Sequence, residues 1–149
     1  MLKNTVNLKS KALDFLSRRD YSYSELYNKL QKYSDDLDQI KFILDELVVR
    51  KFINEERFIE NFIYSKSKKY GSVKVKYLLH NKVANKDLIN QIYDEAQIDE
   101  FSLACQHLIR KFSSAPQDQK EKAKYFRFLQ SRGFSSSIAI RAIEETYKY

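Results

Sequence analysis

The sequence contains very little glycine, proline and cysteine: two glycines, one proline and one cysteine in 149 residues. Sheets need tight turns, and turns draw on Gly, Pro and Asn-Gly pairs. Their scarcity argues against a β-protein and predicts helices joined by short polar connections. The single cysteine, Cys105, has no partner for an internal disulfide, which indicates a reducing compartment, and we expect a cytoplasmic protein.

Long apolar runs are also missing. No stretch approaches the roughly 18 apolar residues of a transmembrane helix, and Met1–Lys11 has no apolar core of the kind found in signal peptides. The composition, 43% hydrophobic and 14% aromatic, is nevertheless too apolar for a disordered chain. We therefore predict a folded all-α protein that does not contact membranes.

Acidic residues are absent from residues 61–86, which hold seven lysines. Residues 1–60 are neutral overall, with eleven Lys/Arg and eleven Asp/Glu, so the net charge of +7 lies in residues 61–149. A charge run of this kind usually forms a solvated surface. A cationic field confined to one part of a folded chain also suits a polyanion, and nucleic acid is the most common polyanion in a cell. Charge alone leaves both interpretations open.

Helix-start and helix-stop signals recur along the whole chain. Ser22 and Glu25 have the spacing of a capping box, and Asn54 followed by two acids is typical of an N-cap. Gly71 is expected to end the fourth helix, and Gly133 to end the eighth in a left-handed conformation. Nine helices are predicted, over about residues 8–19, 22–30, 35–47, 54–71, 72–80, 85–95, 99–112, 117–131 and 135–147.

The helices form an internal repeat. A shift of 51 residues places Val75–Leu78 on Phe126–Leu129, and apolar positions of the following helices also match. A shift of 99 relates the first third of the chain to the last, with a looser fit. We predict three tandem three-helix units, covering residues 1–52, 53–97 and 98–149, in an elongated, curved array. A unit of about 50 residues buries little surface alone, so packing between units must add stability.

Most aromatic residues lie at helix-core spacing. Six phenylalanines are predicted to be core residues: Phe15, Phe42, Phe58, Phe62, Phe126 and Phe134. Four tyrosines interleave with lysines, so they either pack at the edge of a core or stack on nucleic-acid bases. These are Tyr64, Tyr70, Tyr77 and Tyr125.

Catalytic and cofactor motifs are missing. With only two glycines, neither a Walker A loop nor a dinucleotide-binding fingerprint can be written. His80, His107 and Cys105 have no spacing suited to a metal site. Acidic pairs such as Glu55-Glu56 suit helix dipoles better than acid–base catalysis. We expect no enzyme activity, no catalytic residues, no metal and no cofactor.

Four segments together resemble the RecX family of bacterial recombination regulators. They are Ser22-x-x-Glu25-Leu26-x-x-Lys29-Leu30, Asn54–Ile63, Tyr70–Leu78 and the segment from Lys124 through Arg127 to Ser135. They occur in the order and spacing of the family, from about Lys11 to Glu144. The chain lacks a glycine at three places where the family commonly has one: at Lys82, at Lys51 and in the turn at residues 33–36.

The resemblance implies a three-helix-repeat protein that binds RecA, the bacterial recombinase, assembled as a filament on single-stranded DNA. It implies inhibition of ATP hydrolysis, strand exchange and filament growth, and so a role in DNA repair, recombination and the SOS response. We expect a monomer. The alternatives are a helical nucleic-acid-binding protein of transcription-factor type that acts without RecA, and a scaffold that contacts only protein.

Eleven cations are the candidate contacts to nucleic acid or to the RecA filament: Lys66, Lys68, Lys69, Lys74, Lys76, Lys82, Lys86, Lys122, Lys124, Arg127 and Arg132. The last four fall in a second acid-free run, residues 122–142. Arg127 is expected to be the repeat equivalent of Lys76, on the same face of the next unit. Arginine also pairs with protein carboxylates, so Arg127 and Arg132 suit either DNA or RecA. The neutral first unit is expected to contact protein rather than DNA.

Overall fold

The computed structural model describes residues 7–148, which form nine α-helices and no strand. Residues 1–6 and 149 lie outside the described part. Residues 1–6 make up most of the N-terminal segment whose sequence argues against a signal peptide. The helices are α1 (Leu8–Arg18), α2 (Tyr23–Leu30), α3 (Leu37–Val49), α4 (Glu55–Lys66), α5 (Ser72–His80), α6 (Lys86–Ala96), α7 (Glu100–Lys111), α8 (Gln119–Ser131) and α9 (Ser136–Thr146). The predicted all-α class is confirmed.

Side-chain caps explain where the helices begin. Eight of the nine described helices have an Asn, Asp or Ser N-cap that accepts a hydrogen bond from the backbone three residues on. The predicted capping box of α2 is present: Ser22 Oγ accepts from the Glu25 N–H, and Glu25 Oε1 accepts from the Ser22 N–H, both at 3.1 Å. The exception is α5, whose N-cap is Gly71. Gly71 therefore begins α5, and the prediction that it ends α4 is wrong.

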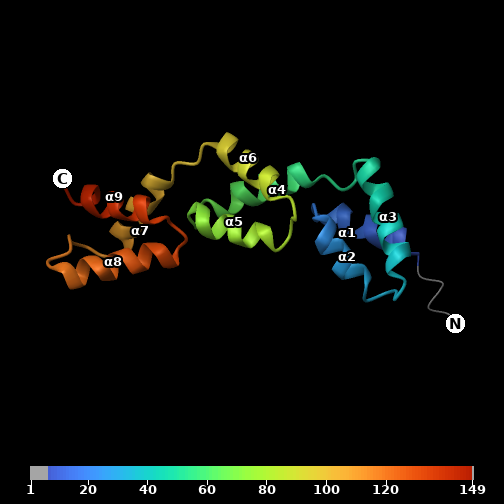
Figure 1. Cartoon of the computed structure of the whole chain (residues 1–149), viewed down its shortest axis with the longest axis horizontal. Coiled ribbons are helices and arrows are strands. Elements are labelled where there is room, and N and C mark those ends of the chain that lie inside the picture. Colours follow the sequence, from blue (N-terminus) through green and yellow to red (C-terminus); the bar gives the residue numbers. More distant parts are fainter. Residues whose placement is uncertain (1–6, 149) are drawn as a thin grey trace.

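Three separate clusters of buried side chains lie between three groups of helices, α1–α3, α4–α6 and α7–α9. In Figure 1 the groups lie in a row from the N-terminal end, in blue, to the C-terminal end, in red, so the described chain is elongated. Each group is called a unit below. The exact unit boundaries, 1–52, 53–97 and 98–149, stay a prediction.

Burial defines the register of the repeat. Fully or largely buried residues of the second and third units are related by a shift of 50, in the pairs Val75/Tyr125, Leu79/Leu129 and Ile89/Ala139. The predicted shift of 51 is wrong by one residue in these helices and applies only to Val83 and Phe134. One more residue separates Leu129 from Phe134 than separates Leu79 from Val83, and one fewer separates Phe134 from Ala139 than separates Val83 from Ile89. The shift of 51 is therefore confined to the turn, and it displaced the alignment of the helices.

One of the six phenylalanines predicted to be core residues is exposed. Phe42 on α3 leaves 72% of its surface accessible. The buried face of this helix is formed by Ile40, Leu44 and Leu47. These positions recur at helical spacing, and residue 42 lies on the opposite side. Phe58 and Phe134 are buried, and the other three pack partly buried against the cores.

Two glycines allow the second and third units to approach closely. The Gly71 N–H donates to the Arg132 carbonyl and the Val73 N–H to the Gly133 carbonyl, both at 3.0 Å. A Cβ on Gly71 would lie 2.5 Å from the Gly133 oxygen, and a Cβ on Gly133 would lie 2.3 Å from Cβ of Lys74. Gly133 has a φ of +90°, as predicted for the residue that ends α8. Figure 1 shows the turn between α8 and α9 directed at the start of α5.

Ion pairs replace the glycine contact between the first and second units. The turn between α5 and α6 carries Lys82, whose Nζ lies 3.0 Å from Glu25 Oε2. Arg57 on α4 holds both carboxylate oxygens of Asp20, at 2.7 and 2.8 Å. Burial acts to raise the pKa of Glu25, but hydrogen bonds, the strongest from Lys82, lower the pKa below its usual value. The glycine missing at position 82 is therefore compensated by a cation that pairs across the junction.

A second device is shared by both junctions. Glu55, the first residue of α4, accepts a hydrogen bond from the Tyr23 N–H at the start of α2, at 3.0 Å. Glu100, the first residue of α7, accepts from the Ser72 N–H at the start of α5, at 2.8 Å. In each case the first helix of one unit caps the second helix of the preceding unit.

Candidate nucleic-acid interface

The seven lysines of residues 61–86 line the chain between the end of α4 and the start of α6. In order they are Lys66, Lys68 and Lys69 around the end of α4, Lys74 and Lys76 on α5, Lys82 in the next turn and Lys86 at the start of α6. The four candidates of the third unit are Lys122, Lys124 and Arg127 on α8 and Arg132 at its C-terminal end. The candidate surface thus spans the second and third units.

The eleven cations differ in exposure. Seven are exposed: Lys68, Lys69, Lys86, Lys122, Lys124, Arg127 and Arg132. Four are half-buried: Lys66, Lys74, Lys76 and Lys82. The half-buried group includes Lys82, whose ammonium is paired with Glu25 and holds two units together. A ligand phosphate would have to compete with that carboxylate for Lys82.

Several of these lysines lie over aromatic rings. The Nζ of Lys68 is 4.2 Å from the ring centroid of Tyr64, and the Nζ of Lys74 is 4.5 Å from that of Tyr70. At exposed sites such contacts contribute about 0.5–1 kcal/mol. The rings orient the lysines without neutralising their charge.

The four interleaved tyrosines separate into different environments. Tyr64 and Tyr77 expose 70% and 65% of their surface, so both rings are accessible to a ligand. Tyr125 is buried, and its hydroxyl donates to the Ser114 carbonyl at 2.7 Å. Tyr70 is half-buried against the core of the second unit. The rings of Tyr64 and Tyr77 can therefore stack on nucleic-acid bases, whereas the buried ring of Tyr125 cannot.

The corrected repeat register changes one pairing of candidate residues. With a shift of 50, Arg127 corresponds to the exposed Tyr77, and Lys124 corresponds to Lys74. The predicted equivalence of Arg127 and Lys76 is wrong. Lys76 is half-buried, with its Nζ 5.0 Å from the Tyr93 ring, whereas Arg127 is exposed.

One cation close to the candidate residues was not predicted. Arg110, in the last turn of α7, lies three residues after His107 and therefore on the same face of the helix. Burial lowers the pKa of His107, and the charges of Arg132 and Arg110 lower it further, while the backbone of Lys69 beside the ring acts in the opposite direction. Arg110 lies outside the two acid-free runs. Only the fold brings it beside Lys69 and Arg132.

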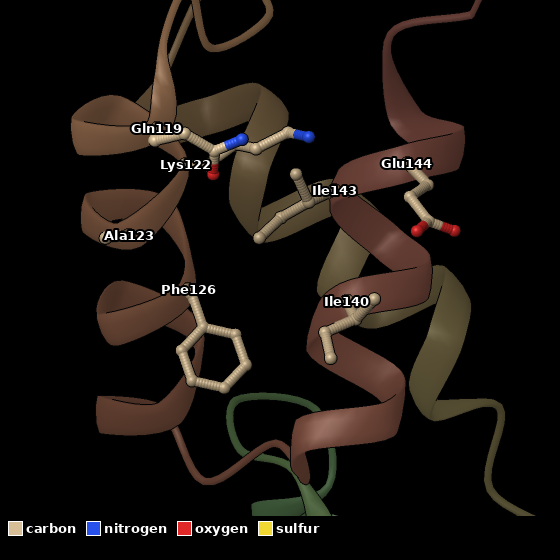
Figure 2. Close-up of a pocket in the computed structure, with 7 residues that line it drawn as sticks. All are labelled: Gln119, Lys122, Ala123, Phe126, Ile140, Ile143 and Glu144. Atoms are coloured by element: carbon tan, nitrogen blue, oxygen red, sulfur yellow. The ribbon is translucent and has the colours of Figure 1, made fainter.

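A pocket of about 240 Å³ opens between α8 and α9 of the third unit. Figure 2 shows Phe126 of α8 facing Ile140 and Ile143 of α9 across it, with Lys122 near one end. The lining is mainly apolar. This composition suits an apolar side chain rather than a phosphate group.

Within residues 7–148, no group of three or more His, Cys, Asp or Glu side chains is placed to hold a metal ion. In the same range no helix is both long enough and apolar enough to cross a membrane.

Comparisons with known proteins give one consistent result. The family model described as "RecX, third three-helix domain" matches residues 98–143. The chain is 34% identical over 148 residues to the regulatory protein RecX of Herbaspirillum seropedicae, covering 99% of this chain and 94% of that protein. It is 38% identical over 139 residues to the regulatory protein RecX of Acinetobacter baylyi, covering 91% and 86% respectively.

Solved structures agree with the fold. The crystal structure of RecX from Lactobacillus salivarius superposes with a TM-score of 0.77 at 21% identity, over 93% of this chain and 94% of that one. A second crystal structure, of regulatory protein RecX, gives a TM-score of 0.78 at 20% identity, over 95% of this chain and 76% of that one.

Proposed function

The chain belongs to the RecX family of regulatory proteins, and from this premise we propose that it binds the filament that RecA forms on single-stranded DNA. Binding inhibits ATP hydrolysis, strand exchange and filament growth. The protein thereby limits recombination and modulates DNA repair and the SOS response. It acts without a cofactor, as a monomer that reads no base sequence.

One observation carries the DNA part of the proposal: exposed cations extend over the second and third units, while residues 1–60 are neutral overall. Seven of the eleven candidate cations are exposed, and they lie in the turn after α4, at the start of α6, on α8 and at the C-terminal end of α8. If about four to six of them meet phosphates, log K for a single strand falls with log salt at a slope of roughly −3 to −4. A slope near zero would remove DNA from the proposal.

An elongated array of units suits a filament because it can follow a groove and contact successive protomers. The first unit offers a different surface from the other two. Its helix α3 exposes Phe42, at 72%, one helical turn after Asp38, and Val49, at 79%, at its C-terminal end. An apolar surface next to acids suits a protein partner better than a phosphate backbone.

We expect the acids at the start of α3 to serve protein contact. Reversing Asp35, Asp36 and Asp38 to lysine should weaken binding to the RecA filament and spare binding to DNA alone. Filament binding and DNA binding are measured separately, each by fluorescence anisotropy of labelled DNA with and without RecA. Equal loss of both affinities would contradict a division of labour between the units.

The test of the proposed function is the rate of ATP hydrolysis by RecA on single-stranded DNA, with this protein titrated in. We expect progressive inhibition that is complete near a one-to-one ratio. An unchanged rate at that ratio would overturn the proposal. DNA binding without RecA, measured in the same buffer, then identifies the alternative of a nucleic-acid-binding protein that acts alone.

The alternative as a sequence-reading transcription factor receives little support from α6, the helix that would enter the major groove. Its exposed residues include Asp87, Asp94 and Glu95 beside the single cation Lys86. Base readout uses Arg, Asn or Gln on a surface that DNA attracts. An acidic helix face argues for contact through the phosphate backbone elsewhere on the molecule.

A further inference from the structure

The two junctions between units differ in how their cations are neutralised. At the first junction, Glu25 contacts both Arg19 and Lys82, at 3.3 and 3.0 Å. Asp20 contacts Arg57 at 2.7 Å. The cations at this junction are therefore paired with carboxylates, and little unpaired charge is left to bind a charged ligand.

At the second junction, four cations come from four different segments. They are Lys69 in the turn after α4, Lys74 on α5, Arg110 on α7 and Arg132 after α8, and are called the junction cations below. None of them forms an ion pair with a carboxylate among residues 7–148. Glu100, an acid at this junction, accepts a hydrogen bond from the backbone N–H of Ser72 at 2.8 Å, so its charge lies at the start of α5.

Contacts around His107 and Gly133 show that these segments meet. The backbone of Lys69 lies beside the His107 ring, and both arginines are near enough to act on its charge. The His107 ring lies edge-on to Phe134, with centroids 5.5 Å apart, next to the turn that carries Arg132. Gly133 lies against the side chain of Lys74, with no room even for a methyl group between them.

We propose that the junction cations form a binding site for consecutive phosphates of a single DNA strand. The inference rests on the proposed function, because it identifies the part of the surface that meets the DNA of the filament. Guanidinium groups hold phosphate oxygens bidentately, and the lysines add point charges on either side. The site adds Arg110 to the candidate contacts and assigns Lys82 to the structure of the other junction.

The surroundings of the site favour a single strand over protein carboxylates. Tyr64, 70% exposed, lies in the last turn of α4, one helical turn before the segment that contains Lys69. Exposed aromatic rings beside cations bind unpaired bases by stacking, at about 1–3 kcal/mol per base. A carboxylate partner would make no use of such a ring. Phosphates at the junction and a base on Tyr64 would place one strand across the second and third units.

The test uses a fluorescein-labelled oligothymidine of about 20 nucleotides, which gives every base the same stacking surface. The double variant Arg110→Gln/Arg132→Gln removes two junction cations. The matched control Lys41→Gln/Lys120→Gln removes two exposed cations that belong neither to the junction cations nor to the candidate contacts. Arg132 contacts the second unit through its backbone carbonyl, so the side-chain change leaves that hydrogen bond in place. Thermal unfolding of both variants verifies that they fold.

We expect the junction variant to weaken DNA binding about ten-fold or more and to make the salt slope shallower by roughly 1.4, the value for two lost contacts on a single strand. The control should weaken binding only about two-fold, through the loss of general attraction. Equal effects of the two variants would overturn the site and indicate a diffuse cationic surface. So would a wild-type protein that does not bind the oligothymidine at all.

RecA-dependent ATP hydrolysis, measured with the same variants, separates this inference from the proposed function. A wild-type protein that inhibits RecA, with a junction variant that binds DNA normally, overturns the site and leaves the function standing. Loss of inhibition with normal DNA binding overturns it too, because the cations then contact protein carboxylates. A wild-type protein that fails to inhibit, yet binds DNA through the junction, overturns the proposed function and supports the site.

Discussion

Lys51 occupies a backbone position that suits glycine. Its φ is +65°, and it lies just after α3, where its N–H donates to the Val48 carbonyl at 3.0 Å. For a residue with a Cβ, this left-handed conformation costs roughly 1–2 kcal/mol. Glycine removes that cost. It also increases the conformational entropy of the unfolded chain, which cancels about 0.5–1 kcal/mol of the gain in stability.

We therefore expect Lys51→Gly to raise the free energy of unfolding by about 0.5 kcal/mol, measured by urea denaturation. The control is Lys41→Gly, at an exposed position inside α3, which should lower stability by about 1 kcal/mol because glycine is a poor helix former. A destabilised Lys51→Gly protein would show that the lysine side chain makes contacts that outweigh the backbone strain.

His107 couples stability to pH. Burial, with Arg132 and Arg110, holds its pKa in the folded protein below the ordinary value of 6.5. The unfolded chain therefore binds a proton more readily, and stability is fully present above about pH 6.5 and declines as the pH falls below it. We expect the midpoint temperature of thermal unfolding to decrease when the pH is lowered from 7.5 to 5.5. The substitution His107→Gln should make this decrease smaller.

Carboxylates act in a lower pH range, so the two effects can be separated. The pKa values of Asp20 and Glu25 lie below their ordinary values of 3.8 and 4.5. A lowered carboxylate pKa contributes stability above that range, which is lost only as the pH falls further. If the midpoint temperature of the His107→Gln variant decreases between pH 7.5 and 5.5 by as much as that of the wild type, His107 is excluded as the cause.

At the residue scale, local features could be predicted from the sequence, whereas tertiary contacts could not. The capping serine at position 22, the N-cap at Asn54 and the positive φ of Gly133 depend on neighbours a few residues away, and all three were predicted correctly. The pairing of Lys82 with Glu25 joins residues 57 positions apart. No pattern in the chain indicates such a contact, because it depends on how two units pack.

At the scale of helices, the first residue of each unit's first helix stabilises the second helix of the unit before it. Glu100 satisfies the Ser72 N–H where α5 has only glycine as its N-cap, and a negative charge there also suits the helix dipole. We expect Glu100→Ala to lower the free energy of unfolding by about 1 kcal/mol. Glu100→Gln, which keeps an acceptor oxygen but loses the charge, should lose less.

The matched comparison is Glu55→Ala, because Glu55 makes the equivalent contact to the Tyr23 N–H. α2 also has its own capping box, so this loss should be smaller than that of Glu100→Ala. Urea denaturation of the three variants measures the order. A larger loss at position 55 would show that the carboxylate contributes mainly through unit packing rather than through capping.

Helix positions were predictable because capping residues and apolar periodicity mark each helix locally. The faces of the helices were less predictable. An extra residue in the turn before Phe134 moved the repeat alignment by one, and at 100° per residue that is enough to exchange a buried face for an exposed one. Phe42 was assigned to the core together with the aromatic residues at helix-core spacing, although the buried stripe of α3 runs through Ile40, Leu44 and Leu47.

At the scale of the whole molecule, the two junctions should respond differently to salt. The junction of the second and third units depends on close glycine contact and backbone hydrogen bonds, which salt does not screen. The junction of the first and second units depends on ion pairs that retain some exposure to solvent, with side-chain accessibilities of 35% for Lys82 and 16% for Glu25. At about 1 M salt the screening length falls to roughly 3 Å, so these pairs weaken.

Distances between spin labels test this difference in a Cys105→Ala background. Labels at Asn28 and Asn90, both exposed, span the first junction, and labels at Asn90 and Gln130 span the second. Raising salt should broaden the distance distribution across the first junction and leave that across the second unchanged. Lys82→Gln should broaden the first already at low salt, because it removes the cation that replaces the glycine contact. Equal responses at both junctions would mean that apolar packing, rather than charge, sets the angle between the first two units.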